Sequence, residues 1–231
     1  MRAWTSSLLA VLPWLPPADL PPAPVVPCAI AVEVQVQAHL EWGSLEWHLF
    51  TGEVEQVWAP YGVTFCWAEG PRGCEGVEAR VRVLIADDLP ASAVRETARQ
   101  PVVGRITFHA DAPGSDIVLS LTTARHLVVH ATLGGRPISE WPAAIAEHLI
   151  PRVMGRALAH EVGHYVLGTR EHASRGLMAA SFRPDAVTLG GATRFSLPRP
   201  DAARMRLECV AGASRRARRD RSWIWKCVTC A

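Results

Sequence analysis

Several features are scarce in this 231-residue sequence, and each absence excludes a class of protein. No apolar run reaches the ~18 residues that a transmembrane helix needs, so no membrane-spanning segment is predicted. The formal net charge is only +2, which predicts no general attraction to nucleic acids or other polyanions. The C-x-x-C pair at Cys227 and Cys230 has no second pair at zinc-ribbon spacing, so it does not indicate a zinc or redox motif by itself.

The composition predicts one folded domain between two unlike ends. Hydrophobic residues make up 49% of the sequence, which is enough for a sizeable core. We expect residues 28–210 to form this domain and 1–27 to be a signal peptide with a proline-rich linker. Residues 211–231 form a basic tail with tryptophans and cysteines, and a charge run of this kind is more typical of a solvated segment than of nucleic-acid recognition.

The N-terminal segment gives mixed evidence for export. Residues 3–15 have the short apolar centre of a secretory signal, but only Arg2 precedes them and Pro13 interrupts them. No clean A-x-A-like cleavage site follows, and a disordered leader or a wrongly assigned start codon would give the same pattern. The six cysteines favour a secreted or periplasmic protein, because disulfides persist in oxidising compartments.

Cys66 and Cys74 are the clearest candidates for a disulfide. They flank a short loop rich in glycine and proline, which a disulfide would staple. Cys28 and Cys209 lie near opposite ends of the predicted domain and could also pair, but the spacing does not decide it.

The hydrophobic periodicity predicts an α+β fold. Alternating apolar residues indicate strands, and apolar residues three or four apart indicate helices. The predicted strands are 31–38, 63–68, 77–86, 104–109 and 116–121, and the predicted helices are 42–58, 152–167 and 199–207. Residues 111–114 carry a strong turn signal between the last two strands.

The pentapeptide His-Glu-Val-Gly-His, residues 160–164, lies within the predicted helix 152–167. Residues four apart share one face of a helix, so His160 and His164 can direct two imidazoles at one point, as half of a tetrahedral Zn²⁺ site. Glu161 reaches the same point from the side, where it can accept a proton from a zinc-bound water. Gly163 allows another element to pack closely against this helix. The histidines His126, His130 and His148 stand at spacings that suit no shared zinc site, and we expect them to be structural.

A third zinc ligand is expected after the helix ends. On a continued helix His172 would lie about 12 Å beyond His164, too far to share a metal with Zn–N bonds of about 2.0–2.1 Å. Gly168 can end the helix in a left-handed conformation and turn the chain back. Glu171, which is adjacent, and Asp185, farther along the chain, are alternative ligands that the sequence leaves open.

Residues 160–178 read His-Glu-Val-Gly-His-Tyr-Val-Leu-Gly-Thr-Arg-Glu-His-Ala-Ser-Arg-Gly-Leu-Met. This stretch resembles the motif of the metzincin metallopeptidases. That motif is H-E-x-x-H-x-x-G-x-x-H, followed by a methionine turn. By this resemblance His160 and His164 are zinc ligands, Glu161 is the general base, and Met178 lies beneath the metal.

The match to the metzincin motif is not complete. Gly168 comes one residue late, and His172, which corresponds to the third ligand, comes two residues late. The tyrosine that some metzincins carry after the methionine is absent from residues 179–182, so no such ligand or oxyanion stabiliser is expected there.

The resemblance implies a metzincin-like zincin domain, with a twisted mixed sheet packed on the active-site helix and an N-terminal helix. It implies a zinc-dependent endopeptidase acting on a peptide or protein, and an edge strand, expected at 117–121, that pairs with the substrate. The alternatives are a non-catalytic metal-stabilised or anion-binding module, or another H-E-x-x-H peptidase that uses Asp185 or Glu171 as a ligand. Glu161 argues against a non-catalytic module, because a structural zinc site has no use for a base.

Overall fold

The computed structural model describes residues 28–37, 40–68, 74, 75, 77, 79–89 and 102–203, and the structural statements below refer to these residues. The predicted leader (1–27), the basic tail (211–231) and Cys209 lie outside this range. No helix within it is both long enough and apolar enough to cross a membrane. Cys66 and Cys74 form the predicted disulfide.

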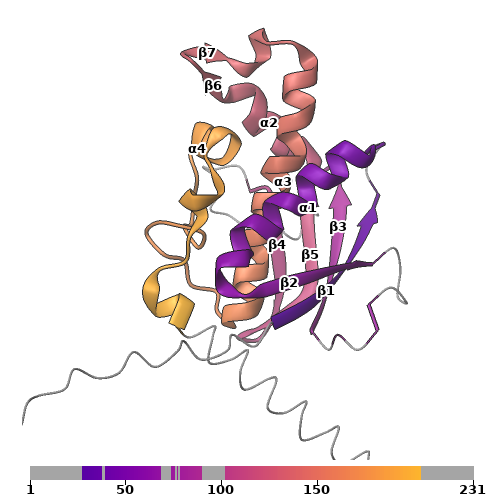
Figure 1. Ribbon diagram of the computed structural model, residues 1–231, viewed down its shortest axis with the longest axis vertical. Helices are drawn as coiled ribbons and strands as arrows, with labels where there is room; N and C mark the ends of the chain where they lie inside the picture. Colours follow the sequence, from indigo (N-terminus) through magenta and orange to yellow (C-terminus); the bar gives the residue numbers. More distant parts are fainter. Residues whose placement is uncertain are drawn as a thin grey trace, which may run out of the picture.

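A mixed, mostly parallel sheet forms one layer of the molecule (Figure 1). The strand order is β2-β1-β3-β5-β4. The strands are β1 (Cys28–Val36), β2 (Val63–Ala68), β3 (Ala79–Ala86), β4 (Gly104–His109) and β5 (Ala112–Ser120). Every neighbouring pair in this sheet is parallel except β4 and β5, so the antiparallel strand β4 forms one edge.

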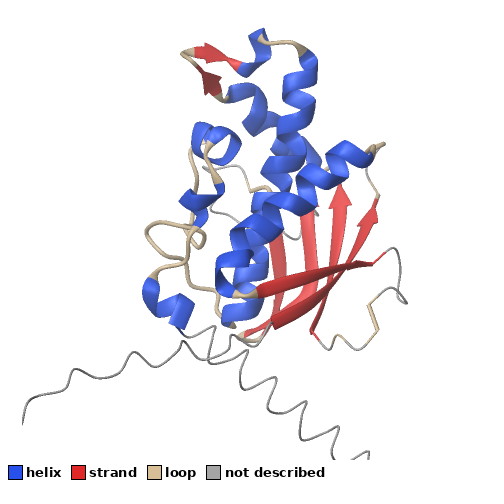
Figure 2. Cartoon of the chain, viewed as in Figure 1, coloured by secondary structure: helices blue, strands red, loops and turns tan. Residues whose placement is uncertain are grey.

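Two long helices, α1 (Ser44–Trp58) and α3 (Ala143–Leu167), pack together over one face of the sheet (Figures 1 and 2). The sequence of β3 matches this packing against the helices. Val81 and Val83 are almost completely buried, whereas the alternating residues Arg80 and Arg82 are exposed. This alternation is typical of a strand with one dry and one solvated face, and it confirms the predicted packing of a mixed sheet on these two helices.

Shorter elements complete the domain around α3. They are η1 (Ala59–Tyr61), α2 (Leu121–His130), β6 (Thr132–Leu133), β7 (Arg136–Pro137), η3 (Ile138–Glu140), α4 (Pro184–Leu189) and η4 (Ala192–Phe195). The segment from α2 to η3 projects from one end of the molecule, while the segment with α4 lies beside α3 (Figure 1).

The predicted edge strand, 117–121, is not at the edge of the sheet. Residues 112–120 form β5, which pairs with β3 on one side and β4 on the other. Ile117 and Leu119 are fully buried. The strand at this edge of the sheet is β4, so β5 is an interior strand.

The turn between β4 and β5 is shorter than the predicted turn at 111–114. Phe108 pairs with Pro113 and His109 with Ala112, so residues 112–114 belong to the strand. The turn consists of Ala110, whose φ is 54°, and Asp111. The pairing of the two strands therefore overrides the local preference of proline and glycine for turns.

Helix α3 begins at Ala143, nine residues before the predicted start at residue 152. Pro151 lies inside it, where it removes one backbone hydrogen bond. The flanking residues Leu149 and Val153 are buried against the core, and this packing carries the helix through the proline.

Helix α2 was not predicted, because its first residue, Leu121, completes the apolar run of β5. Its N-terminus carries a recognisable signal, since the Ser120 hydroxyl accepts a hydrogen bond from the Thr123 N–H at 3.1 Å. A serine at this position caps a helix by satisfying one of its unpaired N–H groups.

Candidate metal centre

Helix α3 presents the two histidines of the pentapeptide at its C-terminal end. Gly168 ends the helix in the left-handed region (φ 61°, ψ 33°), and its N–H donates a hydrogen bond to the His164 carbonyl. This is the predicted helix stop, and it directs the following residues back towards the histidines.

The structure brings His160, His164 and His172 together. One ring nitrogen from each lies within 4.8 Å of the others. The Nε2 atoms of His160 and His164 are 3.2 Å apart, close to the ~3.3 Å that two nitrogens on one tetrahedral Zn²⁺ would show. The His172 ring lies 5.3 Å from the His160 ring and 4.8 Å from the His164 ring, measured between centroids.

Backbone carbonyls fix the orientation of two of these rings. Nδ1 of His160 lies 2.6 Å from the Leu177 oxygen, and Nδ1 of His164 lies 2.8 Å from the Thr169 oxygen. Each Nδ1 must therefore carry the proton, which leaves a lone pair on Nε2 in the neutral imidazole. The two lone pairs face each other at 3.2 Å, and a cation between them would convert this repulsion into coordination. Three such nitrogens suit zinc.

The electrostatic environment keeps the three imidazoles neutral near pH 7. Burial lowers the pKa of His160 to about 4, against the opposing effect of the Leu177 carbonyl. Burial also lowers the pKa of His164. The pKa of the more exposed His172 is lowered for the same reason, because neighbouring groups partly desolvate its ring. Neutral imidazole is the form that binds a metal.

Glu161 lies beside the histidines but is not one of the cluster. Its side chain is buried, and Oε2 accepts a hydrogen bond of 2.9 Å from the Ile106 N–H of strand β4. Burial raises the pKa of this carboxyl group to about 7, while the Ile106 hydrogen bond and the nearby Arg105 oppose the rise. The contact to β4 therefore places a single carboxylate between the helix and the edge strand.

Met178 lies against the helix at Gly163, within a turn closed by the Ala179 N–H, which donates to the Gly176 carbonyl at 3.2 Å. A Cβ at position 163 would overlap the Met178 sulfur and displace that side chain, so glycine permits this close approach, as the sequence predicted. Leu177, the preceding residue, supplies the carbonyl that orients His160. The methionine turn and the ligand-bearing helix thus hold each other in place.

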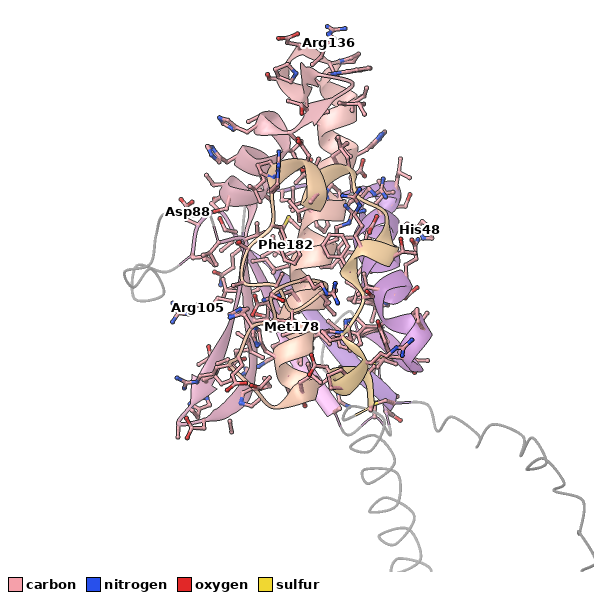
Figure 3. The ribbon with its side chains drawn as sticks, turned by 90° about the vertical axis from the view of Figure 1, so that its left-hand side faces the viewer. His48, Asp88, Arg105, Arg136, Met178 and Phe182 are labelled. Carbon is pink, nitrogen blue, oxygen red and sulfur yellow. A yellow bond between two sulfur atoms is a disulfide. The ribbon has the colours of Figure 1, made fainter. Side chains whose placement is uncertain are left out.

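Two phenylalanines border the cluster, and the sequence interpretation assigned neither a role. Phe108 of β4 packs edge-on against His164 at 6.0 Å, and Phe182 packs edge-on against His160 at 6.1 Å. Figure 3 shows Phe182 and Met178 near the centre of the face that carries the segment after α3. The alternation of residues along β4 is enough to assign Phe108 to one face of the strand. Its contact with His164 of α3 could not be predicted, because no local sequence pattern links the two residues.

The alternative ligands lie elsewhere. Asp185 accepts hydrogen bonds from the backbone N–H and the hydroxyl of Thr132, at 2.7 and 3.1 Å. Glu171 is exposed, and among the described residues the metal-binding cluster consists of the three histidines without it. His126 and His130 pair with each other on α2, and His148 is exposed on α3, in agreement with a role outside the cluster.

A second buried polar group lies one turn before His160. The Arg156 side chain is completely buried and forms ion pairs with Glu53 of α1, with Nε 2.9 Å from Oε2. Arg156 also donates through Nη1 to the Val187 carbonyl at 2.7 Å. Arg152 contacts the other Glu53 oxygen at 2.6 Å. Gly155 permits this approach, because a Cβ there would overlap the Phe50 carbonyl of α1.

Comparisons with known proteins show a distant structural likeness. No protein-family model matches the sequence, and no curated protein matches it. Among solved structures, the chain is similar to archaemetzincin from Methanopyrus kandleri, with a TM-score of 0.45 and 16% sequence identity. The likeness covers 82% of this chain and 98% of the archaemetzincin chain.

Proposed function

We propose that this protein is a zinc-dependent endopeptidase with a metzincin-like domain over residues 28–210. One observation carries the proposal. Three imidazoles, from His160, His164 and His172, converge on one point, and the separate buried carboxylate of Glu161 lies beside them. Zinc-dependent peptide hydrolysis uses this combination of a metal site with three protein ligands and a base that does not bind the metal.

The three histidines would hold the ion through one ring nitrogen each. The Leu177 and Thr169 carbonyls keep Nε2 of His160 and His164 unprotonated and directed at the cluster. A bound zinc ion supplies a Lewis acid and lowers the pKa of a coordinated water to about 7.

Glu161 would move the proton. One carboxylate oxygen, Oε2, is held by the Ile106 N–H, so the group has a fixed orientation relative to strand β4. In that position it accepts a proton from the attacking water and later donates it to the leaving amine. The edge of β4 is the place where an extended peptide can add as a further strand and present its carbonyl to the cluster.

The alternative is a non-catalytic module that uses the metal only for stability. A structural zinc site is usually closed by four protein ligands, and the cluster found among the described residues supplies three. A purely structural role for the metal would also not explain why a buried carboxylate, that of Glu161, lies beside the three histidines.

The decisive variant is Glu161→Gln, which keeps the shape of the side chain and removes its basicity. We expect near-stoichiometric zinc by metal analysis and a loss of turnover of about 10²–10⁴-fold on a peptide library. The matched control is Glu171→Gln, an exposed neighbour, which should retain both zinc and turnover. Unchanged turnover in Glu161→Gln would overturn the peptidase proposal.

We further propose that the protein functions in an oxidising compartment, as a secreted or periplasmic protein. The disulfide between Cys66 and Cys74 supports this location, because such bonds are rarely maintained in a reducing cytosol. Mass spectrometry of unreduced digests of protein from its native compartment should find the two cysteines linked. Recovery of both as thiols would contradict the proposed location.

A further inference from the structure

A cavity of about 650 Å³ lies beside the histidine cluster, and its lining residues come from the segment between Ser174 and Pro198. Phe182 connects the two sites. Its ring lines the cavity and also packs edge-on against His160, with 6.1 Å between the centroids. Phe195 lines the cavity as well and contacts Phe182 at 5.3 Å. The cavity is therefore separated from the candidate metal site by one aromatic side chain.

The wall of this cavity is positively charged. Arg175, Arg183 and Arg194 line it, and no aspartate or glutamate does so among the residues that the structure places there. All three arginines are exposed. The ion pairs found in the described part of the chain involve other arginines, namely Arg82, Arg136, Arg152 and Arg156. Three guanidinium groups thus face one cavity without an acidic partner from the described residues.

The chemistry of this lining favours one kind of ligand. A guanidinium group stays charged at every physiological pH, and its planar fork matches a carboxylate with two parallel hydrogen bonds. The half-buried ring of Phe182 offers an apolar surface for the methylene groups that carry such a carboxylate. Serine and threonine hydroxyls supply further donors, from Ser174, Ser181, Thr193 and Ser196.

We propose that this cavity binds a carboxylate of the peptide substrate, so that the protein prefers acidic peptides. The inference rests on the proposed function, because it assigns the ligand of the cavity to the substrate of the adjacent site. An extended chain advances about 3.3 Å per residue, so a peptide bond at the cluster places a residue two or three positions away within reach of the cavity.

Position-scanned peptides test the proposal on the full-length, zinc-loaded chain. Each set carries glutamate, glutamine or lysine at one of three positions on either side of the cleaved bond, with both ends blocked. We expect glutamate to exceed glutamine in kcat/KM by about tenfold at one position, because charge-assisted hydrogen bonds are roughly twice as strong as neutral ones. A second pair, with free and amidated C-termini, distinguishes a side-chain carboxylate from a terminal one.

The matched variants are a triple Arg175→Gln, Arg183→Gln, Arg194→Gln protein and an Arg136→Gln control. Arg136 lies at one end of the molecule, away from Phe182 (Figure 3). The triple variant should lose the preference for glutamate mainly through KM, and the control should keep it. Binding of the same peptides to Glu161→Gln, measured by fluorescence anisotropy, should reproduce the preference without hydrolysis.

The two proposals fail in different ways. Equal use of glutamate and glutamine at every position, or a preference that survives in the triple variant, would overturn the carboxylate site while leaving the peptidase assignment intact. Tight, arginine-dependent binding of acidic peptides with no cleavage of any peptide would support the carboxylate site and contradict the peptidase assignment.

Discussion

Helix α3 buries charged or polar side chains in two places, and the two groups differ in how their polar atoms are satisfied. At the first place Arg156 donates to both oxygens of Glu53 and to the Val187 carbonyl, and its guanidinium lies over the Phe195 ring. At the second place, one turn later, the Nε2 atoms of His160 and His164 face each other.

This difference separates a structural polar group from a candidate functional one on the same helix. A buried ion pair with all its partners present is complete within the protein. Two unprotonated nitrogens that face each other are complete only with a cation between them. The arginine group is expected to support the fold, whereas the histidine group and Glu161 are expected to reduce stability until metal binds.

The largest expected effect comes from breaking the complete group. Arg156→Met leaves Glu53 buried with only the partly exposed Arg152 as its partner, and loss of one partner of a buried pair costs about 3–5 kcal/mol. We expect this loss in the free energy of unfolding by urea. The control is Arg136→Met, which removes an exposed pair with Glu140 at 3.5 Å and should cost less than about 0.5 kcal/mol. Equal effects of the two variants would refute the assigned structural role.

The next effect has the opposite sign and concerns Glu161 in the metal-free protein. Its pKa of about 7, against an ordinary value of 4.5, means that the folded state holds a proton that the unfolded state releases. The resulting penalty is absent below about pH 4.5, grows between pH 4.5 and 7, and is complete above pH 7, where it is on the order of 3 kcal/mol.

Glu161→Gln should therefore raise the unfolding free energy of the metal-free protein at pH 8 and leave it nearly unchanged at pH 4.5. Urea unfolding at both pH values, in the presence of a chelator, measures the difference. The exposed Glu171→Gln variant should show no such gain. Destabilisation by Glu161→Gln at pH 8 would mean that the carboxylate supports the fold and would weaken the contrast with Glu53.

A smaller effect is expected where the methionine turn meets the helix. Gly163→Ala places a methyl group against the Met178 sulfur, and overpacking of this kind costs about 1–3 kcal/mol. Because Leu177 beside it orients His160, zinc affinity should fall as well. The matched control is Gly52→Ala in α1, where a Cβ meets nothing within 4 Å; it should stabilise the protein by about 0.5–1 kcal/mol. Thermal unfolding and zinc titration of both variants check the difference, and Gly163→Ala behaving like Gly52→Ala would count against this packing.

The sequence predicts local geometry better than long-range contacts. The i, i+4 spacing of His160 and His164 and the helix stop at Gly168 depend on residues close in the chain, and both are present. The partners of Glu161 and Arg156, which are Ile106 and Glu53, lie far away in the sequence and carry no local signal.

The same reason explains the errors in the fold. Local pattern identified the apolar run after residue 116 as a strand, but its position in the sheet depends on pairing with both β3 and β4. Pro151 disfavours a helix locally, and only the packing of the buried residues around it shows that α3 continues. The return of His172 depends on hydrogen bonds made beyond it, such as that from the Ala173 N–H to the Met178 carbonyl at 2.7 Å.

A competitive zinc titration of three single variants tests the central claim most directly. His172→Ala should weaken zinc binding by more than about 100-fold, because it removes one of three protein ligands. Glu171→Ala and Asp185→Ala should bind zinc nearly as well as the wild type, since the first side chain is exposed and the second is engaged with Thr132. Normal zinc binding by His172→Ala together with a loss in Asp185→Ala would contradict the three-histidine centre.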